Sequence, residues 1–145
     1  MDFFDAINTS SAALSAQRLR MNLISGNLAN LNTTRTRAGG PYRRKEAVFV
    51  AQPLNRSFEQ ILADRQNRHL STVRVAEVVE DQNPPVLKYD PSHPDADANG
   101  YVAMPNINLM EEMVNMISAS RGYEANVTAL KAAKDMALKA LEIGR

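Results

Sequence analysis

The side chains best suited to chemistry in this sequence are His93, Asp95 and Asp97, which fall within five consecutive positions. An imidazole beside two carboxylates could bind a metal ion, and a histidine with an aspartate could act as the acid and base of a hydrolase. The spacing lacks the twelve-residue pattern of a calcium loop, and the prolines and aspartates here are ordinary turn formers. We therefore expect a loop without a ligand, and a hydrolase using His93 and Asp95 stays as a rival hypothesis.

A second group of candidate residues is basic: Arg35, Arg37, Arg43, Arg44 and Lys45 form a run that no acid interrupts. Such a run can contact nucleic acid, but the net charge is only +1 and no known binding motif accompanies it. The run suits a solvated turn or a charged contact with an acidic patch on a neighbouring subunit. We predict no nucleic-acid partner.

The remaining composition gives no further support to catalysis. The 145 residues include no cysteine, which excludes disulfides, thiolate nucleophiles and thiolate-ligated zinc. No serine, histidine and aspartate fall in an arrangement with a recognisable nucleophile turn. We predict a non-enzymatic protein with no catalytic residue, no cofactor and no metal.

Membrane insertion and a cleaved export signal are also not expected. The longest uninterrupted apolar run, 47–51, is far shorter than the ~20 residues that cross a bilayer. Asp2 and Asp5 precede the first basic residue, Arg18, which is the reverse of the basic start of a secretory signal. We predict no direct bilayer insertion.

The elements that would position these side chains begin with a helix at the N-terminal end. No proline falls between Phe4 and Asn32, and the segment 38–41, Ala-Gly-Gly-Pro, marks a strong stop. A seven-residue apolar repeat predicts a helix that packs against other helices. The repeat consists of Ile7, Leu14, Met21 and Leu28, with Ile24 and Leu31 near the complementary positions.

A second, longer helix is predicted after Pro105. Asn108 followed by Glu111 resembles a capping box, and acids near the start with lysines toward the end match the helix dipole. Apolar and small residues alternate at four and three positions along it, which predicts a second packing seam. The seam comprises Leu109, Met113, Met116, Ser120, Tyr123, Val127, Leu130, Lys134, Ala137 and Leu141.

Both helices carry apolar residues outside these seams, for example Met110, Ile117 and Met136. A lone two-helix hairpin buries one side of each helix, so the surplus predicts burial against further copies or partners. A monomeric helical bundle, acting as an adaptor that presents the middle of the chain to a client, is the alternative.

The middle of the chain predicts strands at 44–50, 73–79, 86–89 and 101–104, with 86–89 pairing back on 73–79 as a hairpin. The segment 90–100 reads as a long polar loop, and 57–62 permits a short helix. The fold class is therefore α+β: long N- and C-terminal helices pair as a coiled-coil-like hairpin, with a small central β module. The expected divisions are 1–34, 35–105 and 106–145.

Several stretches of the sequence resemble one family, the flagellar rod and hook axial proteins. The Asn-Leu-Ala-Asn motif at 27–30 is shared by the whole family, and the segment 40–45 with Val48 and Phe49 narrows the resemblance to the proximal rod. The segment 90–97, Asp-Pro-Ser-His-Pro-Asp-Ala-Asp, narrows it further, to one protein of the proximal rod. The other matching stretches are 13–22, 99–108 and 112–127. The resemblance covers nearly the whole chain.

The resemblance implies a structural subunit that is exported by the flagellar type III apparatus without a cleaved signal and polymerises helically in the periplasm. It would transmit torque from the membrane ring to the distal rod and hook. Implied partners are copies of itself, the rod proteins FlgB, FlgF and FlgG, the adaptor FliE and the MS-ring protein. Asn27, Asn30 and Asn32 would lie at a packed joint. The residues expected in helix packing between subunits are Ile7, Leu14, Met21, Ile24, Leu28, Leu31, Leu109, Met113, Met116, Tyr123, Val127, Leu130 and Leu141.

Overall fold

The computed structural model describes residues 3–53 and 71–143, and the short helix expected at 57–62 lies outside them. Two helices and two small antiparallel sheets confirm the α+β class. The elements are α1 (Phe3–Ala29), β1 (Lys45–Pro53), β2 (Ser71–Glu80), β3 (Val86–Tyr89), β4 (Tyr101–Met104) and α3 (Leu109–Ile143).

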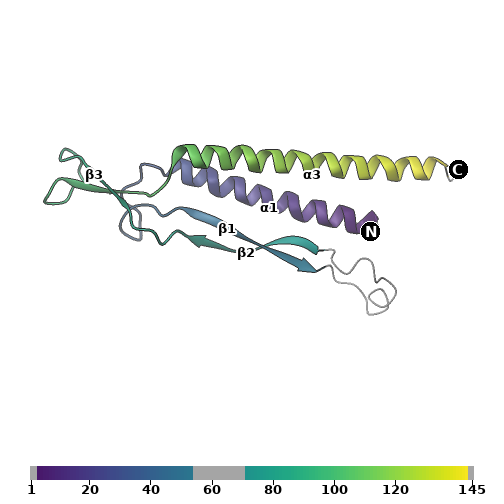
Figure 1. Ribbon diagram of the computed structural model, residues 1–145, viewed down its shortest axis with the longest axis horizontal. Helices are drawn as coiled ribbons and strands as arrows, with labels where there is room; N and C mark the ends of the chain where they lie inside the picture. The colour runs from purple at the N-terminus through teal and green to yellow at the C-terminus, as the bar shows by residue number, and fades with distance from the viewer. Residues whose placement is uncertain (1–2, 54–70, 144–145) are drawn as a thin grey trace.

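Helix α1 is the middle layer of the molecule. Figure 1 shows α3 along one side of α1 and the β1–β2 ribbon along the other. Because both sides are covered, Ala16, Ile24 and Asn27 are buried, and apart from Phe4 the exposed residues of α1 form a narrow, mostly polar strip. The strip consists of Asn8, Ser11, Ser15, Arg18, Asn22, Ser25 and Ala29.

The face of α3 that packs on α1 differs in register from the predicted seam. The two agree at Met116, Ser120, Tyr123, Val127, Leu130 and Ala137, but the predicted Leu109, Met113, Lys134 and Leu141 are exposed. The packed face also includes Glu112, Ala119, Asn126 and Ala133, each one residue before a predicted seam position.

Small side chains explain this register, because they let the two helix backbones approach closely. Ala119 is fully buried, and a Cβ built on Gly122 would lie only 3.3 Å from Gln17 Nε2. Large apolar side chains at these two positions would force α1 and α3 apart. The large apolar side chains of α3 lie instead on its outer face.

The predicted cap at the start of α3 is confirmed. Asn108 Oδ1 accepts hydrogen bonds from the backbone N–H groups of Met110 (3.0 Å) and Glu111 (3.4 Å), two donors that have no partner inside the helix. At the end of α1, Asn30 Nδ2 donates to the Gly26 carbonyl at 2.8 Å and thereby satisfies one of the last acceptors of that helix.

The four predicted strands are present, but one pairing was wrong. β1 pairs with β2, with a bulge between Val48 and Phe49, and β3 pairs with β4 rather than turning back on β2. Pro84 and Pro85 lie between β2 and β3 and have no backbone N–H, so a tight hairpin there would lack donors. The segment 90–100 closes the β3–β4 hairpin instead, with Asp90 N–H donating to the Gly100 carbonyl at 2.9 Å.

Within residues 3–53 and 71–143, no helix is both long enough and apolar enough to cross a bilayer.

Candidate functional site

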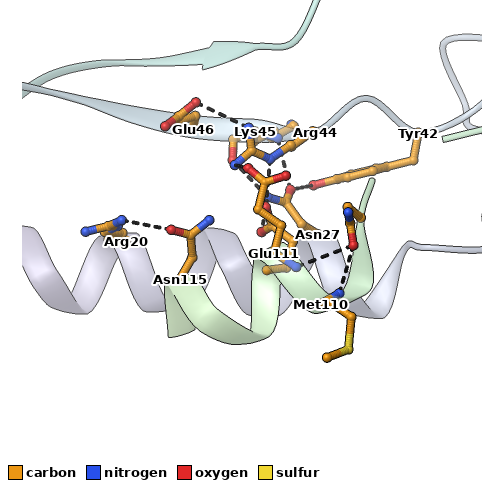
Figure 2. A network of polar contacts seen from close by, with 11 residues as sticks. Arg20, Asn27, Tyr42, Arg44, Lys45, Glu46, Met110, Glu111 and Asn115 are labelled. Atoms are coloured by element: carbon orange, nitrogen blue, oxygen red, sulfur yellow. Dashed lines mark hydrogen bonds and ion pairs between the residues drawn. The ribbon is translucent and has the colours of Figure 1, made fainter. Parts of the chain in front are cut away.

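A buried polar joint holds the three layers together at one end of the helix pair. Asn27 on α1 is 1% exposed, and its side chain makes four hydrogen bonds (Figure 2). Its amide nitrogen donates to the Lys45 carbonyl and to Glu112 Oε2, both at 3.0 Å. Its amide oxygen accepts from the Lys45 N–H at 2.9 Å and from the Tyr42 hydroxyl at 3.1 Å. An asparagine side chain supplies two donors and two acceptors at once.

Glu112 and Arg44 complete this joint. Glu112 is 1% exposed, and its Oε1 accepts from Arg44 Nε at 2.7 Å, a short charge-assisted hydrogen bond. Arg44 also lies 3.5 Å from Glu46 Oε2 and 3.9 Å from Glu111 Oε1. Both oxygens of the buried carboxylate are therefore paired, as a buried charge requires.

The ionisation of two residues reflects this packing. Burial raises the pKa of Tyr42 above its ordinary value, and the carboxylates of Glu80 and Glu112 act in the same direction, against Lys45. Burial by itself lowers the pKa of Arg44, but the hydrogen bond and charge of Glu112, together with two further carboxylates, leave that pKa raised. The guanidinium is held charged and the phenol neutral.

The joint connects elements and offers no reacting group. Asn27 comes from α1, Lys45 begins β1 with Arg44 directly before it, and Glu112 comes from the first turns of α3, where the helix dipole favours a carboxylate. The polar atoms of Asn27 and Glu112 are used by one another, by Arg44 and Tyr42, and by the backbone of Lys45. Glu112 was not predicted as a site residue. The one signal in the sequence was that an acid lies one position from the predicted apolar seam of α3.

The predicted basic run does not form one patch. Arg44 lies in the joint, whereas Lys45 Nζ lies 3.4 Å from Glu80 and Arg43 donates to the Asp81 carbonyl at 3.4 Å. Arg35 lies 4.0 Å from Asp95 Oδ1 in the β3–β4 loop. Arg37 is exposed. The run is thus divided between the ends of two hairpins and the joint.

The acidic loop at 90–100 uses its side chains to form turns. His93 Nδ1 accepts from the Asp95 N–H at 3.1 Å, and Asp97 Oδ1 accepts from the N–H groups of Asn99 (2.9 Å) and Tyr101 (2.8 Å). Asp95 Oδ2 accepts from the Thr34 hydroxyl at 2.8 Å. In the part of the chain that the structure describes, no cluster of three His, Cys, Asp or Glu side chains is arranged to hold a metal.

The other predicted site residues are spread over the helices. Asn30 caps the end of α1, and Asn32 beyond it is exposed. The predicted packing residues differ in exposure. Ile24 is buried; Ile7, Leu14, Met21, Leu28, Leu31, Met116, Tyr123, Val127 and Leu130 are half-buried; Leu109, Met113 and Leu141 are exposed.

The exposed large apolar residues of α3 are the second notable feature of the surface, and they form two groups, one near the start of the helix and one near its end. We call them together the α3 apolar face: Leu109, Met110, Met113, Val114, Ile117, Met136, Leu138, Leu141 and Ile143, all exposed. Ile117, for example, is 53% exposed and Met110 67%. An apolar surface of this extent on one helix is typical of a site that other proteins cover.

Comparison with known proteins identifies the relatives of the chain. Residues 7–35 match the family model of flagellar basal-body rod proteins, and residues 98–143 match that of the C-terminal part of the rod proteins FlgE, FlgF and FlgG. The rod protein FlgC of Borreliella burgdorferi is 47% identical over 99% of this chain and 98% of its own length. FlgC of Bacillus subtilis is 44% identical and that of Salmonella typhimurium 39%, each over the full length of both proteins.

These relatives confirm the predicted resemblance to flagellar rod proteins and identify FlgC as the rod protein that the chain resembles. The names of these relatives describe structural proteins of the flagellum, and the chain is accordingly a structural subunit of the basal-body rod rather than an enzyme. As a rod protein it assembles with other rod components in the flagellar basal body. The chain belongs to the FlgC family of flagellar basal-body rod proteins.

Proposed function

We propose that the chain polymerises helically in the proximal rod and transmits torque from the membrane ring to the distal rod and hook. The observation that carries this proposal is the exposed α3 apolar face. Repeated contacts between unlike surfaces build an open helix whenever the rotation between subunits does not close into a ring. Each large side chain that such contacts bury contributes about 1.5–3 kcal/mol.

The polar joint supports the mechanical part of this proposal. A subunit transmits torque only if its layers do not slide past one another. Asn27, Arg44 and Glu112 connect α1, β1 and α3 through directional hydrogen bonds, which fix the layers in one register. In this proposal the helical parts, 1–34 and 106–145, form the inner layer of the rod, and 35–105 is a module packed outside.

The proposed neighbours are copies of the chain, the rod proteins FlgB, FlgF and FlgG, the adaptor FliE and the MS-ring protein. We place the assembled rod in the periplasm and propose export by the flagellar type III system without a cleaved signal. Support comes from the family membership.

The test is a charge on the outward side of α3. Ile117→Asp should abolish incorporation into basal bodies and swimming, because a carboxylate would be buried without a partner between subunits. Ile117 is 53% exposed, so the purified subunit should keep the helix content of the native chain by circular dichroism. Ser118→Asp adds the same charge at an exposed polar position and should cost much less motility. Normal swimming of the Ile117→Asp strain would contradict the proposal.

A further inference from the structure

The β3–β4 hairpin presents one apolar face to solvent. Leu87 pairs with Ala103 and Tyr89 with Tyr101, so these four side chains share one side of the two strands. The rings of Tyr89 and Tyr101 pack edge to face with their centroids 5.3 Å apart. We call these four residues the hairpin patch.

The patch is exposed, and it is held in place from behind. Leu87 and Tyr89 are each 64% exposed and Tyr101 is 43% exposed. Val102 points to the opposite side of the hairpin and is 1% exposed, so β4 is packed on the rest of the chain there, whereas Val86 and Lys88 of β3 on that side are exposed. The connecting loop is fixed by hydrogen bonds in which the carboxylates of Asp90 and Asp97 accept from backbone N–H groups. A rigid apolar surface of this kind loses little entropy on binding.

The charge around the hairpin patch is negative. The hairpin, residues 86–104, carries one lysine, Lys88, and three aspartates, all in the connecting loop. Arg35 lies 4.0 Å from Asp95 and offsets one of the aspartates, which leaves the surface acidic. An apolar partner with lysines beside its contact residues would complement it.

The last turns of α3 have this composition. Residues 131–143 carry three lysines against one aspartate and one glutamate, beside the exposed Met136, Leu138, Leu141 and Ile143. Figure 1 shows the β3–β4 hairpin at one end of the molecule and the C-terminal turns of α3 at the other. The two surfaces cannot meet within one chain, but they can meet between successive subunits.

We propose that the hairpin patch packs on the lysine-bearing last turns of the C-terminal helix of a neighbouring rod subunit. The proposal rests on the assembly function proposed above. The region 98–143, which includes β4 and all of α3, matches a family model shared by several rod proteins. Leu87 and Tyr89 of the hairpin patch fall outside both matched regions, and Tyr101 and Ala103 fall inside the second.

Photo-cross-linking within assembled basal bodies tests the contact. Leu87 is replaced by p-benzoylphenylalanine in flagellated cells, isolated basal bodies are irradiated, and the cross-linked peptides are identified by mass spectrometry. We expect peptides from the last turns of a rod subunit's C-terminal helix. The same substitution at Lys88, on the opposite side of the strand, is the matched control and should lose these peptides.

Peptides from an N-terminal helix, a β module or a ring protein at position 87 would overturn the inference while leaving the proposed function in place. Absence of the chain from basal bodies would overturn both. A second variant, Leu87→Glu, should reduce incorporation several-fold without unfolding the subunit, because Leu87 is mostly exposed. Lys88→Glu should incorporate better than Leu87→Glu, and equal incorporation of Leu87→Glu and the native chain would also count against the contact.

Discussion

At the scale of single residues, the side chain of Asn27 combines properties that no other residue type offers at this place. Two of its hydrogen bonds go to the backbone of Lys45, and the others to Tyr42 and Glu112. An aspartate would place a second carboxylate beside Glu112, and a leucine would leave the buried backbone groups of Lys45 without partners. The joint therefore depends on an amide that is oriented by three different segments of the chain.

Asn27→Ala should lower the free energy of unfolding of the purified subunit by about 2–4 kcal/mol, because it leaves several buried donors and acceptors unpaired. Chemical denaturation followed by circular dichroism measures the effect. Asn32→Ala is the matched control: Asn32 follows the same helix, is exposed, and should change stability by less than about 0.5 kcal/mol. Equal effects of the two substitutions would show that the joint contributes nothing specific.

At the scale of elements, α3 has two faces that use different residues. The face on α1 relies on Ala119, Gly122 and Ala133, while the outward face carries the large apolar side chains. Close helix packing favours small residues, because dispersion contacts between backbones then replace those between long side chains. The inner face of α3 thus positions the subunit's own layers, and the outer face remains for neighbours.

Ala119→Leu should destabilise the isolated subunit by about 1–3 kcal/mol, because the added atoms cannot fit between α1 and α3. The control uses the same substitution on the same helix: Ala129→Leu lies at an exposed position and should be close to neutral. Thermal or chemical unfolding of the two purified variants measures the difference. If Ala119→Leu were as stable as Ala129→Leu, the close packing of the two helices would be refuted.

Local sequence signals determined how much of each element could be predicted from the sequence. Both helices, the cap at Asn108 and the positions of all four strands could be predicted, because proline, glycine and local periodicity determine them. The inner register of α3 could not be read from large apolar residues, since Ala119 and Glu112 mark it. The pairing of β3 with β4 depends on Pro84, Pro85 and a long loop, whereas local strand signals locate strands without determining which strands pair. Glu112 contacts Asn27 only through the tertiary packing of α3 on α1, which local sequence signals do not reveal.

At the scale of the whole molecule, stability and assembly use different parts of the chain. The layered part, in which α1 lies between α3 and the β1–β2 ribbon, holds the joint and the buried residues other than Val102 and Pro105. The C-terminal turns of α3 extend past the start of α1, and their apolar side chains are exposed (Figure 1). Segments with few buried contacts contribute little to global stability. These turns are therefore available to neighbouring subunits at little cost to the fold of the subunit itself.

Deletion of residues 139–145 should separate the two properties. The free energy of unfolding of the purified subunit should change by less than about 1 kcal/mol, because Leu141 and Ile143 are exposed in the isolated chain. Incorporation into basal bodies and swimming should be lost, because neighbours would lack the apolar and lysine side chains of these turns. Denaturation of the purified protein and a motility assay of the deletion strain give the two readings. Ala119→Leu provides the comparison, since it should lower stability while leaving the outer face of α3 intact. A deletion strain that swims normally, or a deleted subunit that unfolds much more easily, would show that the last turns of α3 belong to the fold rather than to the assembly.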